Sequence, residues 1–347
     1  MGSAPRGLVE ASGAVVAFPP PKARPFEGAR QLDHLSRQLE PLGPPVVVFN
    51  ASHSGSRLLA QMLQRLGVFM GHDLNESRDS LPIFDLVRYL VEAHAPDFQP
   101  LLQHGDPDLP ARVRAAFQAH VGSRAVGRWG WKLPETANVM PVISRLFPDA
   151  HYIHLVRDGR DVAFSPFVAP KAPFWRKIYF NSDTITSWRG LAMTQRAYRA
   201  RGHLFNAARW VNSVTLGRAY GAMMGERYLE ISYEAVVANP DAALAQLAAF
   251  LGIDAPLAPF ERDEVRTHSV GKWRHAPPHA VAEVRPILEP TLAAFGYCWQ
   301  AENNPLASRG GALRGWLNRL ALEGRVSAGP GAKPRGLGGL FRVRDRR

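Results

Sequence analysis

The chain has 347 residues, of which 46% are hydrophobic and 21% are charged, and its formal net charge is +12. No run approaches the roughly 18 apolar residues of a membrane-spanning helix, so the composition indicates a globular protein of one large or two smaller domains. Cys298 is the only cysteine, so we expect no disulfide within the chain and a reducing compartment, the cytoplasm. The apolar stretch 13–18 is short and lacks a convincing cleavage site, so we expect no signal peptide.

The charge is concentrated at one end. From residue 303 onward the chain has 10 Lys and Arg against 2 Asp and Glu, and 9 Gly. The high net charge therefore says little about residues 1–302, and without an aromatic-interleaved basic patch we expect no specific nucleic-acid partner. We expect the tail 303–347 to be disordered, with a short amphipathic helix. That helix is compatible with packing on the body, weak contact with a membrane surface or a partner site.

The first 44 residues are rich in proline, with a short helical pattern near 31–39, and we expect a flexible segment. The apolar run Val46–Asn50 then predicts a buried strand. A small polar turn follows it, and a helical pattern covers 57–66. Such a strand, turn and helix direct unpaired N–H groups and the positive helix end at one spot, which suits a phosphate or sulfate. The GxxxxGK[ST] loop of nucleotide triphosphatases is absent.

A second strand, His151–Val156, precedes the sequence R-D-G-R-D-V-A-F-S. Its first residue, Arg157, and its last, Ser165, offer a guanidinium fork and a hydroxyl to a second anion. A further strand is predicted over 227–232, and helices over 83–93, 208–224 and 242–251. Strands separated by helical stretches pair in parallel. We therefore expect residues 45–302 to form one α/β domain with a central parallel sheet flanked by helices.

These segments resemble the sulfotransferases that use 3′-phosphoadenosine-5′-phosphosulfate (PAPS). In that family an R-D-x-R-D-x-x-x-S segment binds the 3′-phosphate, and a P-[RK]-x-G-[TS] loop binds the 5′-phosphosulfate. The first motif is matched closely; the second is matched loosely, with Ser52 in place of Pro and His53 in place of Arg or Lys. Three further segments are similar to family motifs, in family order: W-K-x-P-x-T within 130–136, a strand ending in Y-E at 233–234, and G-x-W-[RK] at 271–274. The resemblance covers about residues 45–297.

The resemblance implies a P-loop-like fold and transfer of a sulfuryl group from PAPS, without a metal, to a hydroxyl or amine of a carbohydrate, lipid or small molecule. It also implies the residues that bind PAPS. They are Ser54, Gly55, Ser56 and Arg57 at the phosphosulfate, Arg157 and Ser165 at the 3′-phosphate, Tyr233 at the adenine, and Gly271, Lys272, Trp273 and Arg274 closing over it.

The resemblance also suggests catalytic residues. A carboxylate a little over twenty residues beyond the basic residue of the loop takes the acceptor proton in the carbohydrate-type branch, and Glu76 lies 23 residues beyond His53. His72 is the alternative base. Imidazole is a weaker cation than Arg or Lys, so either His53, protonated beside phosphate, or Lys132 is expected to stabilise the leaving group, with Arg57 as a further candidate.

Two other functions remain open. A P-loop kinase-like phosphoryl transferase also uses a strand–loop–helix cradle, and a protein that binds PAPS or a nucleotide without catalysis would keep the fold. Acceptor pockets in such folds come from variable loops, here 71–95 and 166–186.

Overall fold

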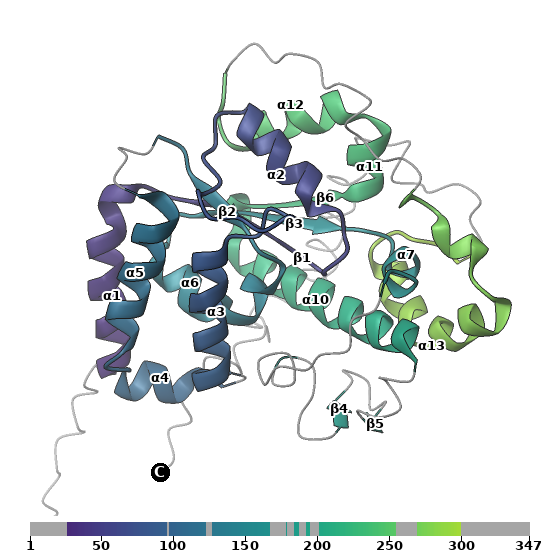
Figure 1. Ribbon diagram of the computed structural model, residues 1–347, viewed down its shortest axis with the longest axis horizontal. Coiled ribbons are helices and arrows are strands. Elements are labelled where there is room, and N and C mark those ends of the chain that lie inside the picture. The colour runs from purple at the N-terminus through teal and green to yellow at the C-terminus, as the bar shows by residue number, and fades with distance from the viewer. Residues whose placement is uncertain are drawn as a thin grey trace, which may run out of the picture.

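A parallel sheet of four strands lies at the centre of the part of the chain that the structure, a computed structural model, describes (Figure 1). That part comprises residues 26–95, 97–122, 127–166, 178, 184–186, 192–194, 201–254 and 269–299. The predictions for residues 1–25, for the tail 303–347 and for most of the loop 166–186 lie outside it. The predicted α/β class, with a central parallel sheet flanked by helices, is confirmed.

The strands run in the order β2–β1–β3–β6 and pair in parallel throughout. They are β1 (Val46–Asn50), β2 (Gly130–Lys132), β3 (His151–Val156) and β6 (Tyr228–Ser232). From β1 the chain passes to β2 on one side and then to β3 on the other side. This reversal opens a crevice at the carboxyl ends of β1 and β3, the usual ligand position in open α/β sheets.

One face of the sheet is covered by three helices, which lie above it in Figure 1. They are α2 (Ser56–Arg65), α11 (Tyr233–Ala238) and α12 (Pro240–Phe250). Their apolar side chains pack with Val48 of β1 and Ile153 of β3. Because alternate strand residues point to opposite faces, the apolar run of β1 buries side chains on both sides of the sheet.

The opposite face carries the long helix α10 (Gly202–Met224). A Cβ atom at Gly217 would lie 2.9 Å from the ring of Phe49 and 2.7 Å from the ring of His154. The glycine therefore lets α10 approach β1 and β3 closely. Beside the amino-terminal half of α10 lie α7 (Gly159–Ala163) and α13 (Pro278–Ala294).

A further group of helices packs beside β2 (Figure 1). Its members are α1 (Glu27–Leu39), α3 (Leu81–His94), α4 (Gln99–His104), α5 (Leu109–Val121) and α6 (Met140–Leu146). Helix α1 buries Leu32, Leu35 and Leu39 in the main core. The folded part thus begins before the boundary expected at residue 45, because α1 is longer than the 31–39 pattern and supplies core side chains.

The remaining described elements are short. They are the 3₁₀ turns η1 (Glu40–Leu42), η2 (Pro134–Val139), η3 (Gly225–Arg227) and η6 (Lys272–His275), and the antiparallel pair β4 (Thr184–Thr186) and β5 (Ala192–Thr194). Two of them, η2 and η6, lie at the site described next.

Candidate functional site

The loop between β1 and α2 is closed by its own hydrogen bonds. The hydroxyl of Ser54 donates to the carbonyl oxygen of Ala51 at 2.6 Å, and the Ser54 N–H donates to the same oxygen at 3.2 Å. Gly55 precedes α2 with φ of 81°, in the left-handed region that glycine adopts without strain. Since the Ser54 amide closes the turn and the Leu58 N–H donates to the Gly55 carbonyl oxygen, the N–H groups of Gly55, Ser56 and Arg57 are the ones that can face an anion.

Arg157 joins this loop to the second predicted anion site. Its guanidinium donates to the carbonyl oxygen of His53 at 3.0 Å and to that of Ser269. The carboxylate of Asp161 lies 3.7 Å from the same side chain. The Nε of Arg157 has no hydrogen-bond partner within the described residues. The two predicted anion-binding segments therefore meet at the carboxyl ends of β1 and β3.

Tyr233 holds the two segments in contact. The guanidinium of Arg157 lies over its ring at 4.7 Å from the centroid. A Cβ atom at Gly55 would come within 2.2 Å of the same ring, so only glycine leaves room for it. With 5% of Tyr233 exposed, the ring supports Arg157 and the loop, and little of it is open to an adenine in this state.

The segment 269–275 is held to the start of α7 by Asp161 and Ser165. The carboxylate of Asp161 accepts the backbone N–H of Gly271 at 2.8 Å and that of Trp273 at 3.0 Å. The Nζ of Lys272 donates to the hydroxyl of Ser165 at 2.8 Å. The structure therefore brings Ser165 and Lys272 together with Arg157, as the sequence predicts, while Arg274 is exposed.

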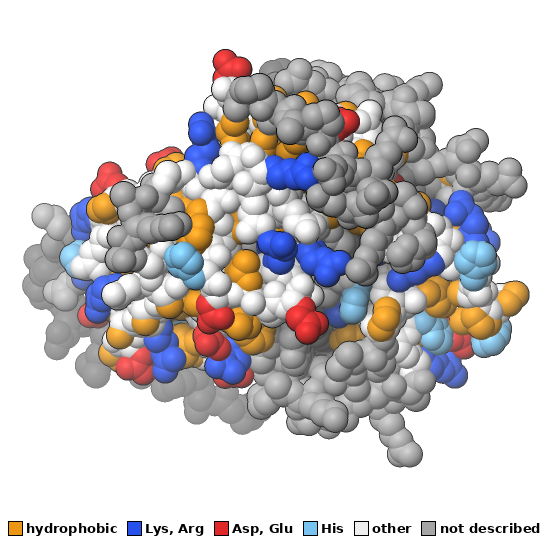
Figure 2. Space-filling view, turned by 45° about the horizontal axis from the view of Figure 1, so that its top comes forward, with side chains coloured by type: hydrophobic (Ala, Val, Ile, Leu, Met, Phe, Trp, Pro, Cys, Tyr) orange, Lys and Arg blue, Asp and Glu red, His pale blue; other side chains and the backbone are white. Residues whose placement is uncertain are grey.

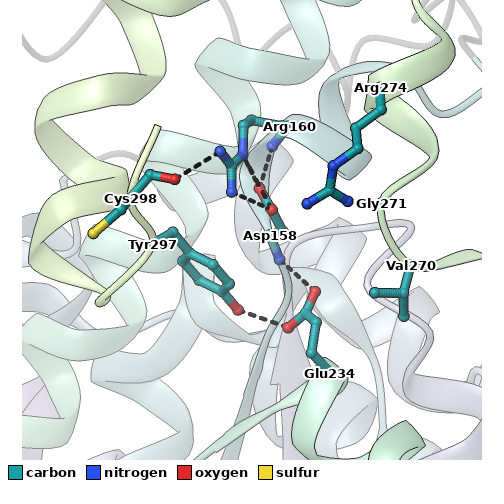
Figure 3. A pocket seen from close by; sticks show the side chains of 8 residues that line it. All are labelled: Asp158, Arg160, Glu234, Val270, Gly271, Arg274, Tyr297 and Cys298. Carbon is teal, nitrogen blue, oxygen red and sulfur yellow. Dashed lines mark hydrogen bonds and ion pairs between the residues drawn. The ribbon is translucent and has the colours of Figure 1, made fainter. Parts of the chain in front are cut away.

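The remaining polar residues of the R-D-G-R-D segment support the site from behind (Figure 3). Arg160 grips the carboxylate of Asp158 with contacts of 2.8 to 3.1 Å. Glu234 accepts the Asp158 N–H at 2.9 Å and the hydroxyl of Tyr297 at 2.8 Å. These groups line a cavity of about 50 Å³ together with Gly271. Their network anchors the start of α7, and with it Arg157.

Glu76 is exposed at the tip of a tight turn, 74–80. Backbone N–H groups of Ser77 and Asp79 donate to the side chain of Asn75 at 2.9 Å each, which closes the turn. Lys132, only 2% exposed, donates from Nζ to the carboxylate of Asp79 and to the carbonyl oxygen of Ser77 at 2.6 Å. Lys132 thus fastens this turn to the end of β2, and its charge is balanced by Asp79.

Glu135 is a carboxylate of the site that the sequence analysis missed. It is the second residue of η2, three positions after the end of β2, and is 5% exposed. Its Oε1 accepts the hydroxyl of Ser52 at 3.4 Å, a long contact that nevertheless places the carboxylate against the anion loop. Burial, and after it the negative charge of Asp79, raises the pKa of Glu135 to about 7. It is the residue next to the Pro of the W-K-L-P-E-T segment, so that motif was the available signal.

Comparison with known proteins adds to this geometry. A family model described as "Sulfotransferase family" matches residues 44–256. The chain belongs to the sulfotransferase family. The comparison with curated proteins finds no match to this sulfotransferase.

Solved sulfotransferases resemble it at low identity. The sulfotransferase domain of the Synechococcus olefin synthase is 18% identical, with a TM-score of 0.41 over 72% of this chain and 94% of that one. The sulfotransferase of Alicyclobacillus acidocaldarius is 17% identical, with a TM-score of 0.41 over 72% and 93%. A mouse sulfotransferase solved in complex with PAP is 12% identical, with a TM-score of 0.39 over 85% and 95%.

The loop of this sulfotransferase brings no permanent cation of its own at position 53. His53 is exposed and has a φ of 69°. Its pKa is lowered to about 4, first by partial desolvation of the ring and then by the charges of Arg209, Lys272 and Arg157. In this state the imidazole is neutral at pH 7.

His72, the alternative base, lies away from the anion loop. Its ring packs edge-on against Phe69 at 4.7 Å between centroids. A Cβ atom at Gly122, just after α5, would lie 3.4 Å from its Nε2. This places His72 at the outer edge of the sulfotransferase sheet, beyond β2.

Among the described helices of the enzyme, none is long and apolar enough to cross a membrane.

Proposed function

We propose that this sulfotransferase moves a sulfuryl group from PAPS to a hydroxyl or amine of a carbohydrate, lipid or small-molecule acceptor. One observation carries the proposal: the α2 amino terminus and the group of Arg157, Ser165 and Lys272 meet at one crevice. Two anion sites joined through Arg157 match a ligand with phosphates at both ends of one nucleoside.

The residues present fit such a ligand. Arg157 is 4% exposed and donates hydrogen bonds to two carbonyl oxygens, and its Nε has no hydrogen-bond partner among the described residues. A phosphate would supply charged acceptors that pair more strongly with a guanidinium than carbonyl groups do. Lys272, whose pKa is lowered by burial and by the charge of Arg157, would regain its usual basicity beside the added negative charge. Figure 2 shows Lys and Arg side chains across the middle of one face, with acidic side chains mainly below them.

The reaction requires a base for the acceptor proton. The acceptor oxygen donates a lone pair to sulfur, and the sulfur–oxygen bond to the phosphate breaks with its electron pair on the phosphate oxygen. The acceptor proton goes to a carboxylate. We propose Glu135 for this role before Glu76, because a buried carboxylate with a raised pKa beside the loop suits a general base near neutral pH. Glu76 is exposed at its turn and would need the acceptor to reach outward.

We keep the other predictions as proposals: PAPS as co-substrate, no metal in the reaction, a cytoplasmic location and no specific nucleic-acid partner. The loops expected to select the acceptor are 71–95 and 166–186, and the second lies largely outside the described residues. The basic tail, with its proposed weak contact to a membrane surface, lies outside them as well.

The test is an acceptor screen with radiolabelled PAPS, covering sugars, glycolipids, phenols and amines, with labelled ATP run in parallel. We expect label to pass from PAPS to one acceptor class and none to pass from ATP. Transfer from ATP alone would identify a phosphoryl transferase instead. Tight PAPS binding without transfer to any acceptor would indicate a binding protein without catalysis.

A further inference from the structure

Arg209 is a buried cation whose hydrogen bonds are not all made. It lies in α10, and 9% of its surface is exposed. Within the described part of the chain its Nε and Nη2 have no hydrogen-bond partner. A guanidinium keeps its positive charge even when it is buried. Burying it without a hydrogen-bonded anion costs stability, and among the described residues its Nε and Nη2 reach no carboxylate.

Two hydrogen bonds locate this part of α10 beside the second anion site. Asn206, one turn before Arg209, donates from Nδ2 to the carbonyl oxygen of Ser165 at 3.0 Å. Trp210, the next residue, donates from Nε1 to the carbonyl oxygen of Arg157 at 2.9 Å. Arg209 is therefore flanked by residues that contact both ends of the R-D-G-R-D-x-x-x-S segment.

The course of α10 places Arg209 beyond the strand ends. Gly217 packs on Phe49 of β1, and Arg209 lies eight positions earlier in the helix, a rise of about 12 Å toward the carboxyl edge of the sheet. The charge of Arg209 acts on groups of two other elements there. It is the leading cation in lowering the pKa of His53 in the loop, and it also lowers that of Glu135 in η2.

The other buried or half-buried cations described at this edge already have hydrogen-bond acceptors. Lys132 pairs with Asp79, Lys272 donates to Ser165, and Arg157 donates to two carbonyl oxygens. Arg57 is exposed in the first turn of α2, where water and salt screen its charge. Arg209 is therefore the cation best able to act on a ligand beside His53 and Glu135.

We propose that Arg209 binds the sulfuryl oxygens of the donor and supplies the positive charge that the loop lacks at His53. This inference rests on the proposed function. A sulfuryl group presents anionic oxygens, and a guanidinium offers several N–H donors in one plane to such a group. When the sulfur–oxygen bond breaks, negative charge grows on the phosphate oxygen, and a fixed cation nearby stabilises it.

The experiment compares the affinities of PAPS and of adenosine 3′,5′-bisphosphate (PAP), which lacks the sulfuryl group, by calorimetry. For Arg209→Gln we expect the Kd of PAPS to rise about 10- to 100-fold, the usual value of a charged hydrogen bond, while that of PAP stays within about threefold. Arg201→Gln makes the same change at an exposed position just before α10, and both affinities should stay unchanged.

A rescue variant separates charge from structure. Adding His53→Lys to Arg209→Gln returns a cation to the loop, so the affinity for PAPS should recover about tenfold; a structural defect in α10 would not be repaired. Unchanged affinities, an equal loss for PAP and PAPS, or no rescue would overturn the inference. A wild-type protein that binds neither ligand would instead overturn the proposed function.

Discussion

The charges around Glu135 illustrate how single residues set the chemistry of this site. Lys132 is tied to Asp79 on the turn that also carries Glu76. Asp79 therefore neutralises much of the positive charge of Lys132. The effect of Lys132 on Glu135 does not offset that of burial, and the pKa of Glu135 stays raised. This arrangement leaves a carboxyl group that exchanges its proton near neutral pH, which a general base requires.

Removing this carboxylate tests its role directly. Glu135→Gln should lower kcat about 10²- to 10⁴-fold, the usual contribution of a general base, and leave PAP affinity nearly intact. Wild-type kcat should fall as the pH drops below about 7, because Glu135 is then protonated. Glu76→Gln is the matched control and should change kcat little. If Glu76→Gln proves the severe variant and Glu135→Gln the mild one, the base predicted from sequence is the correct one.

The same carboxylate affects stability without any ligand. Its folded pKa of about 7 lies above the ordinary value of 4.5, so the unfolded chain loses this proton at lower pH. Stability from this group is therefore present below about pH 4.5 and is lost as the pH rises to about 7. In denaturant titrations Glu135→Gln should gain stability relative to wild type across this window, by up to about 3 kcal/mol. A difference that does not change with pH would show that Glu135 titrates normally.

At the scale of elements, the site depends on how two loops are held in register. Residues of the R-D-G-R-D-x-x-x-S segment make three different contacts. Arg157 bonds to the anion loop, and Asp158 pairs with Arg160 at the start of α7. Asp161 and Ser165 hold the segment 269–275. The ring of Tyr233 lies between Gly55 and Arg157. Disturbing that ring should therefore affect both anion sites.

Two glycines allow this contact to be tested with a control. Gly55 and Gly67, at opposite ends of α2, have φ of 81° and 78°. A Cβ would meet Tyr233 at 2.2 Å in the first case and nothing within 4 Å in the second. Both alanine variants should lose about 1–2 kcal/mol of stability to backbone strain. Gly55→Ala alone should also weaken PAP binding about tenfold or more, and equal PAP affinities in the two variants would contradict the role of Tyr233.

At the scale of the whole molecule, the parallel sheet and the meeting of two anion sites could be predicted from sequence, because each motif directly follows an apolar strand. For α1 the sequence predicts only a short helix near 31–39 within a flexible segment, because surrounding prolines obscure three leucines that pack in the core. Glu135 was overlooked because its burial depends on the path of the chain after β2. Arg209 could not be singled out from the sequence. Helix α10 buries most residues of its amino-terminal half, so the alternation of polar and apolar residues does not mark this arginine as a buried cation.

The central claim is that the loop after β1 and the segment beginning at Arg157 form one site for a nucleotide with phosphates at both its 3′ and 5′ positions. Calorimetric titration of the wild-type protein and of Arg157→Ala with PAP and with adenosine 5′-phosphate tests it most directly. We predict that wild type prefers PAP, and that Arg157→Ala loses about 2–4 kcal/mol of PAP binding while its weak affinity for adenosine 5′-phosphate changes little. Equal wild-type affinities for the two nucleotides, or unchanged PAP affinity in Arg157→Ala, would contradict the claim.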